Sequence, residues 1–399
     1  ELIEATLANI PKERVEDVVL FEPFDLERPM GLNMLEYETP EQKDFSVQEM
    51  IAIFHKLFPP EIIGPMFEHN MRNAMLALMA DEANPGSLVE IPKMFTDNAF
   101  MEQKLQKVTD PGVRDFWLKE WKQMTGNTKS DMLGYIVSKI GRFIENEMMR
   151  NIIGQSRSAF DLAQIMNEKK IFLGNLSKGR TGEINSSLLG LILVSKIQMA
   201  AMRRASVSEE ERPDFYLYID EFQNFATQSF ATILSEARKY RLNLTMANQY
   251  VGQLLFGEKD TTLRDAVVGN VGTLVCFQVG SDDAEVFSLQ YEEAVTPKDI
   301  LSLPKYHTYM RLMIDGTPSK PFSVQTLPPP VFQQDSERVE VLLKLSRERY
   351  AVKRAVVEEK ISKWATSAAQ SRSSSVNETK AKEKEEDEVK KAKKKKIKK

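Results

Sequence analysis

The chain has 399 residues, of which 42% are hydrophobic and 28% are charged, enough apolar material for roughly two or three folded domains. Its single cysteine, Cys276, excludes a disulfide framework and a cysteine-rich zinc site, and its three scattered histidines leave little for a histidine-built metal centre. The longest nearly continuous apolar run, residues 188–194, is far shorter than the roughly 20 residues of a bilayer-spanning helix. The sequence therefore predicts no membrane span.

Charge is distributed unevenly along the chain. Lysine and arginine number 54 against 58 acidic residues, which gives a net charge of -4. Residues 371–399 carry 12 basic and 6 acidic side chains, so residues 1–370 carry 42 basic and 52 acidic ones and a net charge of -10. An acidic folded part does not offer a broad nucleic-acid surface, and any contact with DNA should be local.

The first 150 residues predict one α/β step followed by a helical domain. Residues 1–44 contain a short helical pattern, a strand at residues 18–21 and a loop rich in proline and acidic residues. Over residues 45–150 the apolar positions recur at helical spacing, and strand-like alternation is nearly absent. We expect an all-helical domain inserted after the first part of an α/β core, with methionines such as Met71 and Met75 packed in its interior.

Residues 151–330 predict the second part of that core. Helical segments alternate with short apolar runs at residues 171–173, 215–219, 242–247 and 272–279. This alternation is typical of a mostly parallel sheet covered on both faces, so the predicted fold class is α/β, of a motor or nucleotide-binding kind. Residues 308–327, centred on Asp315 and Gly316, predict an antiparallel hairpin at the edge of the sheet.

The C-terminal part predicts a helix and a tail. Asp335 or Ser336 can cap a charged helix that runs to about Ala365, which gives a C-terminal helix over residues 331–366. Residues 367–399 are rich in Ser, Lys and Glu, and we expect a disordered tail because they cannot bury enough apolar surface. Such a lysine-rich end is most simply solvated, and binding to anionic lipid or nucleic acid is the functional alternative.

Two adjacent acids close one of the predicted strands. The apolar run at residues 215–219 ends in Asp220 and Glu221, and ligands of parallel sheets sit at the carboxyl ends of strands. NTPases use such a pair, in which one acid holds the magnesium shell and the other orients or deprotonates the attacking water. The structural alternative is that Asp220 caps the following segment and Glu221 complements its positive end.

The next predicted strand ends in amides. Residues 242–247 are followed by Asn248 and Gln249, and an amide beside the acid pair can sense a terminal phosphate through hydrogen bonds. Arg238 lies at the end of the helix between the two strands. It can simply complement the helix dipole, or it can reach across a subunit boundary to neutralise charge on a neighbour's γ-phosphate.

One segment nearly matches a phosphate-binding loop. Residues 174–181 read GNLSKGRT and follow a predicted strand, but Arg180 replaces the lysine of the pattern G-x-x-x-x-G-K-S/T. Arginine is bulkier and planar, and four more residues precede a helix expected to start at about Ser186. We therefore expect a different phosphate loop. The chain opens on Glu1 inside an amphipathic run, which leads us to expect that loop upstream of Glu1.

These residues together resemble the type IV secretion coupling ATPases of the TraG/TraD class, which are related to FtsK/HerA-type DNA translocases. The resemblance covers roughly residues 1–330, and it is carried by residues 10–35, 171–183, 214–249 and 269–285. It implies a RecA-like P-loop NTPase core interrupted by a helical domain. The segment around Gln278 departs from the pattern, because relatives often have arginine after the preceding phenylalanine.

The resemblance implies roles for four residues. Asp220 and Glu221 are similar to the family's magnesium-holding and water-activating acids, Gln249 resembles its phosphate-sensing glutamine, and Arg238 occupies the place of its trans-acting arginine. The implied cofactors are ATP and Mg. Without a lysine loop, the chain as given should hydrolyse little ATP alone.

The implied function is ATP-driven translocation of DNA, or of a protein-DNA substrate, into a type IV secretion or conjugation channel. The implied partners are that substrate, secretion-channel proteins and further copies of the chain in a homo-hexamer. The implied location is cytoplasmic, at the inner face of the plasma membrane, with membrane contact only through a segment upstream of this chain. The alternatives are a catalytically inactive motor-like scaffold that recruits substrate, and an FtsK/HerA-type DNA pump.

Overall fold

The computed structural model describes residues 2–59, 61–124, 126–255, 260–328 and 336–362. The chain divides into two compact units, each built from segments that are far apart in the sequence. Unit 1 comprises Glu1–Glu22, Asp44–Gly64 and Phe160–Tyr350, and unit 2 comprises Pro23–Lys43, Pro65–Ala159 and Ala351–Lys399. The segment 44–64, which opens the helical domain expected over residues 45–150, belongs to unit 1.

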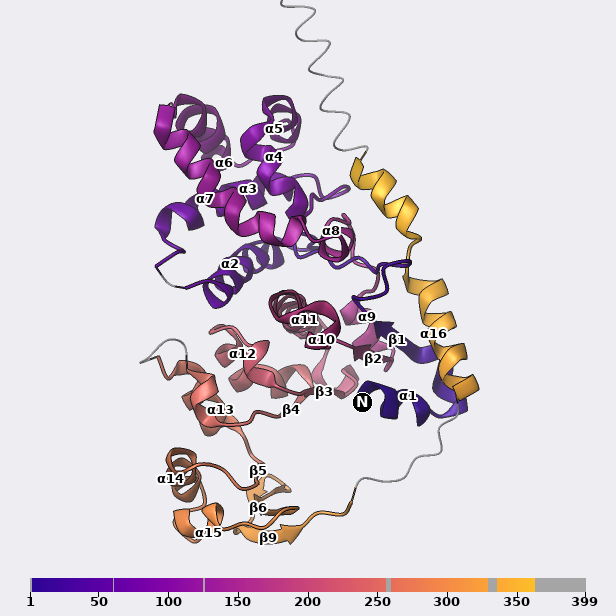
Figure 1. Cartoon of the computed structure of the whole chain (residues 1–399), viewed down its shortest axis with the longest axis vertical. Helices are drawn as coiled ribbons and strands as arrows, with labels where there is room; N and C mark the ends of the chain where they lie inside the picture. Colours follow the sequence, from indigo (N-terminus) through magenta and orange to yellow (C-terminus); the bar gives the residue numbers. More distant parts are fainter. Residues whose placement is uncertain (1, 60, 125, 256–259, 329–335, 363–399) are drawn as a thin grey trace, which may run out of the picture. The chain divides into compact units, whose positions relative to one another are not determined.

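Unit 1 contains two pairs of parallel strands, which can be followed in Figure 1. The pairs are β1 (Val18–Phe21) with β2 (Ile171–Gly174), and β3 (Phe215–Ile219) with β4 (Leu242–Met246). All four residues of β1 are buried, as expected for a strand covered on both faces. The C-terminal helix α16 (Ser336–Tyr350) contributes Leu342 to the apolar cluster around this strand. The predicted α/β core with parallel pairing is confirmed for these four strands.

One face of the β3–β4 pair is open, whereas the sequence predicted burial on both faces. The side chains of Tyr216 and Tyr218 are 61% and 71% exposed, and their cross-strand partners Asn243 and Thr245 are exposed as well. Side chains alternate between the two faces of a strand, so the tyrosines and their partners share one side. Because tyrosine has both an apolar ring and a polar hydroxyl, the run Phe-Tyr-Leu-Tyr-Ile fits a half-exposed strand.

The remaining strands of unit 1 are antiparallel. β5 (Leu274–Cys276) pairs with β6 (His307–Arg311), which pairs in turn with β9 (Phe322–Gln325). The short strands β7 (Met313–Ile314) and β8 (Thr317–Pro318) form the tip of the predicted hairpin. Its turn is at Asp315 and Gly316, both with positive φ, as a two-residue hairpin turn requires. The hairpin is confirmed, but β5 joins it in antiparallel fashion instead of extending a parallel sheet.

Helices fill the rest of unit 1. They are α1 (Leu2–Ala8), α2 (Pro40–Leu57), which begins in unit 2, α9 (Leu162–Asn167), α10 (Lys178–Thr181), α11 (Glu183–Arg203), α12 (Phe230–Glu236), α13 (Thr262–Asn270), α14 (Ser281–Gln290) and α15 (Pro297–Leu301). Short 3₁₀ helices, labelled η, connect them: η1 (Lys12–Asp17), η4 (Arg204–Ser206), η5 (Glu209–Glu211), η6 (Phe222–Asn224), η7 (Ala237–Tyr240) and η8 (Val251–Leu254).

The helix α11 is the central apolar helix of unit 1. Extended to Ser206, it is the one helix in the described part of the chain that is long and apolar enough to cross a membrane, but 83% of its most apolar window is buried inside the structure. A buried core helix passes the same test of length and composition.

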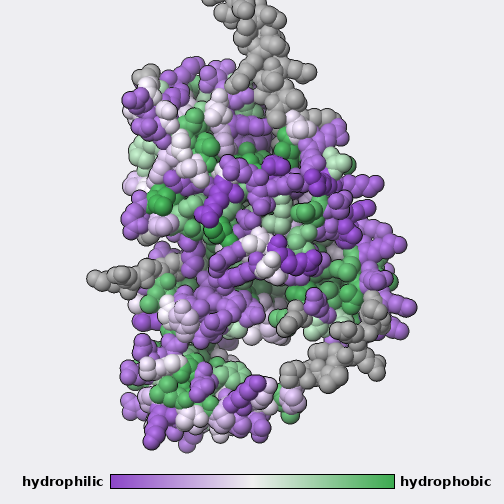
Figure 2. Space-filling model, in the orientation of Figure 1, coloured by the Kyte–Doolittle hydropathy of each residue, from purple (hydrophilic) through white to green (hydrophobic). Residues whose placement is uncertain are grey.

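On the face shown in Figure 2, hydrophilic residues predominate and hydrophobic residues reach the surface in small groups.

Unit 2 is helical, and its described residues contain no strand. Its helices within residues 65–159 are α3 (Pro65–Leu78), η2 (Leu88–Glu90), α4 (Ile91–Thr96), α5 (Asn98–Leu105), α6 (Pro111–Asp115), a π-helical turn (Phe116–Trp121), α7 (Gly126–Ile144) and α8 (Glu147–Ile153). Met71 and Met75 are fully buried in it, and Phe95 contacts the ring of Trp117 at a tilt and the ring of Trp121 edge to face. The expected role of the methionines in core packing is confirmed.

The predicted C-terminal helix is interrupted. α16 ends at Tyr350, and helix resumes over residues 354–362. Between them the backbone N–H groups of Val352 and Arg354 donate to the carbonyls of Pro29 and Glu27, at 3.4 and 3.0 Å. These two bonds replace helical ones, so the chain is extended there. The predicted disordered tail over residues 367–399 lies outside the described residues.

A buried carboxylate supports the loop that follows η6. Glu49 of α2 is only 2% exposed, and its Oε2 accepts hydrogen bonds from Ser195 Oγ at 3.0 Å and Thr227 Oγ1 at 3.2 Å. Ser229 Oγ donates to the other oxygen, Oε1. Burial raises the pKa of Glu49, and the three hydroxyl groups oppose this rise.

Replacing Glu49 by Gln should make part of the pH dependence of stability disappear. Because the folded-state pKa lies above the ordinary value of 4.5, the contribution of Glu49 is fully present below that pH and is lost as the pH rises through the folded pKa. We expect the free energy of unfolding of the wild type, relative to Glu49→Gln, to fall as the pH rises above 4.5 in urea titrations. A difference that does not change with pH would contradict this account.

Candidate functional site

The parallel pairing of β3 and β4 brings the predicted acids and amides to one edge. Ile219, the last residue of β3, is in register with Met246, the last residue of β4. Backbone pairing continues beyond the C-terminal residue of each strand. Ala247 N donates to the carbonyl of Ile219 at 3.0 Å, and Phe222 N donates to the carbonyl of Ala247 at 2.9 Å. The segments that carry the acids and the amides therefore leave the strands side by side.

Glu221 occupies an unusual backbone conformation. Its φ of 50° and ψ of 45° place it in the left-handed region, where a residue with a Cβ pays about 1 kcal/mol or more. It precedes η6, and its carbonyl accepts hydrogen bonds from Asn224 N at 2.9 Å and Asn224 Nδ2 at 3.1 Å. Such conformations concentrate at functional sites, because the surrounding contacts must hold the side chain in one place.

Two amides hold the carboxylate of Glu221. Gln249 Nε2 donates to Glu221 Oε1 at 2.7 Å, and Gln223 Nε2 donates to Oε2. Gln223 is only 7% exposed, whereas Gln249 is exposed. Gln253 Oε1 in turn accepts from the backbone N–H of Gln249 at 3.2 Å. The structure thus joins Glu221 and Gln249 directly, as the sequence predicted, and adds two glutamines that the sequence analysis did not select.

Asp220 is exposed beside this network. Its Oδ1 accepts from the backbone N–H of Glu221 at 2.9 Å, and Oδ2 makes no hydrogen bond with any residue that the structure describes. No group of three or more His, Cys, Asp and Glu side chains among the described residues could hold a metal by itself. A single exposed carboxylate nevertheless fits Mg²⁺, which keeps several waters and is usually bound through one or two carboxylates and substrate phosphates.

Arg238 lies at the other end of the strand pair. It belongs to η7, which precedes β4, whereas Gln249 follows β4. The five residues of β4 span about 16 Å, so the two side chains start from opposite edges. The Arg238 side chain is exposed and has no hydrogen bond or ion pair with the described part of the chain. The structure therefore does not bring Arg238 to Glu221 within one subunit.

The near match to a phosphate loop forms a helical turn. Its backbone N–H groups bond within the segment, since Arg180 and Thr181 donate to Ser177 O at 3.1 and 3.0 Å and Gly182 donates to Lys178 O at 2.9 Å. A phosphate cradle needs such groups free. α11 begins at Glu183, three residues earlier than expected, directly after Gly182.

Lys178 connects that helical turn to the acid pair. Its Nζ donates to Asn224 Oδ1 at 3.2 Å and to Glu183 Oε1 at 3.3 Å. Asn224 bonds the carbonyl of Glu221, so Lys178 supports the turn that carries the acid. The sequence contained Lys178 only as part of the rejected loop, and its distant partner Asn224 could not be inferred.

A small pocket adjoins the acid pair. It encloses about 290 Å³ and is lined by Lys56, Leu57, Ser187, Gln223, Asn224 and Gln253. Burial lowers the pKa of Lys56, and Gln223 Oε1 has no partner among the described residues. The volume of this pocket is at the lower end of the range for ligand pockets, about 300 to 1,000 Å³. The pocket can therefore hold a polar group but not a whole nucleotide.

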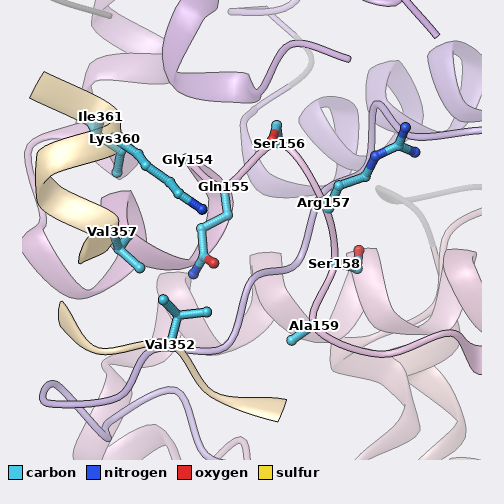
Figure 3. A pocket seen from close by; sticks show the side chains of 10 residues that line it. All are labelled: Gly154, Gln155, Ser156, Arg157, Ser158, Ala159, Val352, Val357, Lys360 and Ile361. Carbon is cyan, nitrogen blue, oxygen red and sulfur yellow. The ribbon is translucent and has the colours of Figure 1, made fainter. Parts of the chain in front are cut away.

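A second pocket, shown in Figure 3, lies within unit 2 and encloses about 230 Å³. The side chains of Lys360, Gln155, Val352 and Val357 lie around it, and Arg157, which also lines it, directs its guanidinium away from them. Arg157 already donates to the carbonyls of Glu82 and Ala83 at 2.8 and 3.1 Å. No acid lines this pocket, so it is not the site of the predicted chemistry.

Comparison with known proteins gives one family. A family model described as type IV secretory system conjugative DNA transfer matches residues 1–291. No curated protein matches the chain significantly.

Several solved structures resemble the chain at low sequence identity. The bacterial conjugative coupling protein TrwBdeltaN70, in an unbound form, has 16% sequence identity and a TM-score of 0.53, over 83% of this chain and 78% of that chain. TrwB in complex with ADP and Mg²⁺ has 16% identity and a TM-score of 0.52, over 81% and 76%. VirB4 of Thermoanaerobacter pseudethanolicus has 12% identity and a TM-score of 0.51, over 78% and 77%. These likenesses confirm the predicted RecA-like NTPase fold.

Glycine and alanine substitutions can test the backbone conformation of the acid pair. Glycine adopts the left-handed region without a penalty, so Glu221→Gly should be more stable than Glu221→Ala by about 1 kcal/mol in urea unfolding. Asp220, whose φ is not positive, is the matched control. There glycine adds only backbone entropy to the unfolded chain, and Asp220→Gly should be less stable than Asp220→Ala. The same order at both positions would contradict the geometry.

Proposed function

The chain belongs to the type IV secretory system conjugative DNA transfer family, and we propose that it acts as a subunit of a coupling ATPase. Its role is to convert ATP hydrolysis into movement of DNA, or of a protein-DNA substrate, toward a type IV secretion channel. The observation that carries this proposal is the contact between Glu221, at the end of one parallel strand, and Gln249, at the end of the next. Adjacent strand ends of this kind are where α/β proteins bind their ligands.

Glu221 is the residue that activates water in this proposal. Its two oxygens accept hydrogen bonds from Gln249 and Gln223, which orients the carboxylate. An ionised carboxylate can accept the proton of the attacking water. When the Gln249 amide turns to the terminal phosphate, Glu221 Oε1 becomes available to that water. Gln249 thereby couples recognition of the phosphate to activation of the water.

Asp220 is the residue that would hold the magnesium shell. Its free Oδ2 faces solvent beside Glu221 and can accept hydrogen bonds from metal-bound water. Mg²⁺ neutralises phosphate charge when it is bound with ATP. TrwB in complex with ADP and Mg²⁺ has the same fold, which supports ATP and Mg as the cofactors of this chain.

Arg238 acts across a subunit boundary in this proposal. It starts about 16 Å from the acid edge of its own subunit, at the opposite end of β4, and its side chain is exposed. A head-to-tail contact would place it against the acid edge of the next copy, and repeated head-to-tail contacts form a ring when the rotation between copies closes. The proposed ring is the homo-hexamer that the family resemblance implies, with an arginine that stabilises the charge of the neighbour's γ-phosphate.

The remaining proposals rest on the family resemblance. In this proposal the helical unit 2 lies at the substrate entrance, and DNA contacts are local because residues 1–370 carry a net charge of -10. Secretion-channel proteins are the partners. The location is cytoplasmic, at the inner face of the plasma membrane.

A catalytically inactive scaffold is the second candidate function. It is favoured by the near match to a phosphate loop, whose backbone N–H groups are already bonded within the chain and which has Arg180 in place of lysine. In that case the fold would recruit substrate, and Glu221 would have no water to activate.

Replacing Glu221 by Gln in the natural full-length protein separates the two functions. We expect turnover of ATP to fall by roughly 10² to 10⁴ fold while nucleotide affinity is retained, because only the acceptor of the proton is removed. Glu285→Gln, at an exposed position of α14, is the control and should keep turnover. Unchanged hydrolysis in Glu221→Gln, or none in the wild type, would favour the scaffold.

Mixed rings test the role of Arg238. Glu221→Gln and Arg238→Ala should each be inactive alone, and a mixture should recover roughly a quarter of wild-type turnover, since some interfaces then pair an intact Glu221 with an intact Arg238. The measurement is ATP hydrolysis after subunits are mixed and reassembled. A mixture that stays inactive would argue against action in trans.

A further inference from the structure

We propose that Arg212 is a positioning residue that fixes the turn from which Arg238 projects. This inference rests on the proposed trans action of Arg238. Arg212 lies in the loop between η4 and β3, and Arg238 lies in η7, the turn before β4. The Arg212 guanidinium connects the two segments, because its Nη1 donates to the carbonyl of Lys239, the residue after Arg238.

The other hydrogen bonds of Arg212 anchor it to its own loop. Nε donates to Val207 O at 2.9 Å, and Nη2 donates to Val207 O at 2.6 Å and to Ala205 O at 3.4 Å. The fork of the guanidinium is thus directed at three backbone carbonyls on two segments. Arginine presents such a fixed, planar set of donors, whereas lysine has one flexible ammonium group.

The loop itself is held at its base by a second arginine. Arg204 is 2% exposed, and its Nη2 donates to the carbonyl of Pro213, the residue after Arg212. Phe215 N, at the start of β3, donates to the carbonyl of Arg241 at 2.9 Å. The loop that carries Arg212 is therefore anchored by the buried side chain of Arg204.

The turn that carries Arg238 is tied on both sides of that residue. Beyond Arg238, Arg241 adopts a left-handed φ of 53°, its N–H donates to Arg238 O at 3.1 Å, and its Nη1 lies 3.6 Å from Asp214 Oδ1. Lys239 is held through its carbonyl by Arg212 and through its Nζ by Glu236 Oε1 at 3.3 Å. The backbone around Arg238 is fixed, while the Arg238 side chain is left exposed to reach another molecule.

This arrangement makes a specific chemical prediction. A residue that acts on a neighbour's phosphate must be positioned accurately, because a misplacement of about 1 Å can lower a rate by roughly a hundredfold. Removing the fork of Arg212 leaves the Arg238 side chain intact but loosens its turn. Arg212→Lys should therefore reduce kcat roughly ten- to hundredfold, less than Arg238→Ala, with little change in the KM for ATP.

Mixed rings of the natural full-length protein test this inference. Arg212 should act in the subunit that donates Arg238. A mixture of Arg212→Lys with Glu221→Gln should recover turnover, because the Glu221→Gln subunit donates an intact arginine to the intact acid of its neighbour. A mixture of Arg212→Lys with Arg238→Ala should stay low, because neither subunit donates a well-placed arginine.

The matched control is Arg114→Lys, which also replaces a guanidinium that holds backbone carbonyls, those of Leu105 and Val108 in unit 2. It should keep wild-type turnover. If Arg212→Lys keeps wild-type turnover, or is rescued by Arg238→Ala and not by Glu221→Gln, the positioning role is overturned. Failure of the Glu221→Gln and Arg238→Ala mixture to recover would instead overturn the trans action of Arg238 on which the inference rests.

Discussion

The parallel register of two short strands determines the geometry of the candidate site. β3 and β4 end opposite each other, at Ile219 and Met246. Two further backbone hydrogen bonds, both made by Ala247, continue the pairing beyond these two residues. This pairing brings Glu221 and Gln249, which are 28 residues apart in the sequence, within 2.7 Å of each other. A shift of one residue in this register would turn these side chains to the other face. The strand pairing places Glu221 and Gln249 at one edge of the strand pair, and it places Arg238 at the opposite edge.

The chain holds Glu221 in a backbone conformation that is unfavourable in free energy. Glu221 sits in a left-handed conformation, Gln223 and Gln249 bond its two oxygens, and Lys178 reaches its turn through Asn224. Local strain of this kind persists only where neighbouring contacts determine it, and it is common at functional sites. Because Gln249 is exposed and Gln223 is buried, the outer contact can break while the inner one keeps the carboxylate in place.

Sequence reasoning located residues correctly where the pattern is local. The acid doublet after an apolar strand, the amide after the next strand and the hairpin turn at Asp315 are short patterns whose meaning depends on a few neighbouring residues. It failed where a distant partner decides the outcome. Gln223 and Lys178 became informative only through contacts with Glu221 and Asn224.

The larger differences between prediction and structure have the same cause. The C-terminal helix breaks because Val352 and Arg354 find partners at Pro29 and Glu27, more than 300 residues earlier. The segment 44–64 looks helical like unit 2, but it belongs to unit 1, where Glu49 meets hydroxyl groups of residues 195, 227 and 229. Periodicity predicts that a segment is a helix, and it does not identify the surface against which that helix packs.

The most direct measurement is the structure of the natural full-length protein with Mg²⁺ and a non-hydrolysable ATP analogue. The account predicts the terminal phosphate within hydrogen-bond distance of Gln249, metal-bound water beside Asp220, and Arg238 contributed by the neighbouring copy. A triphosphate bound away from the ends of β3 and β4 would contradict it.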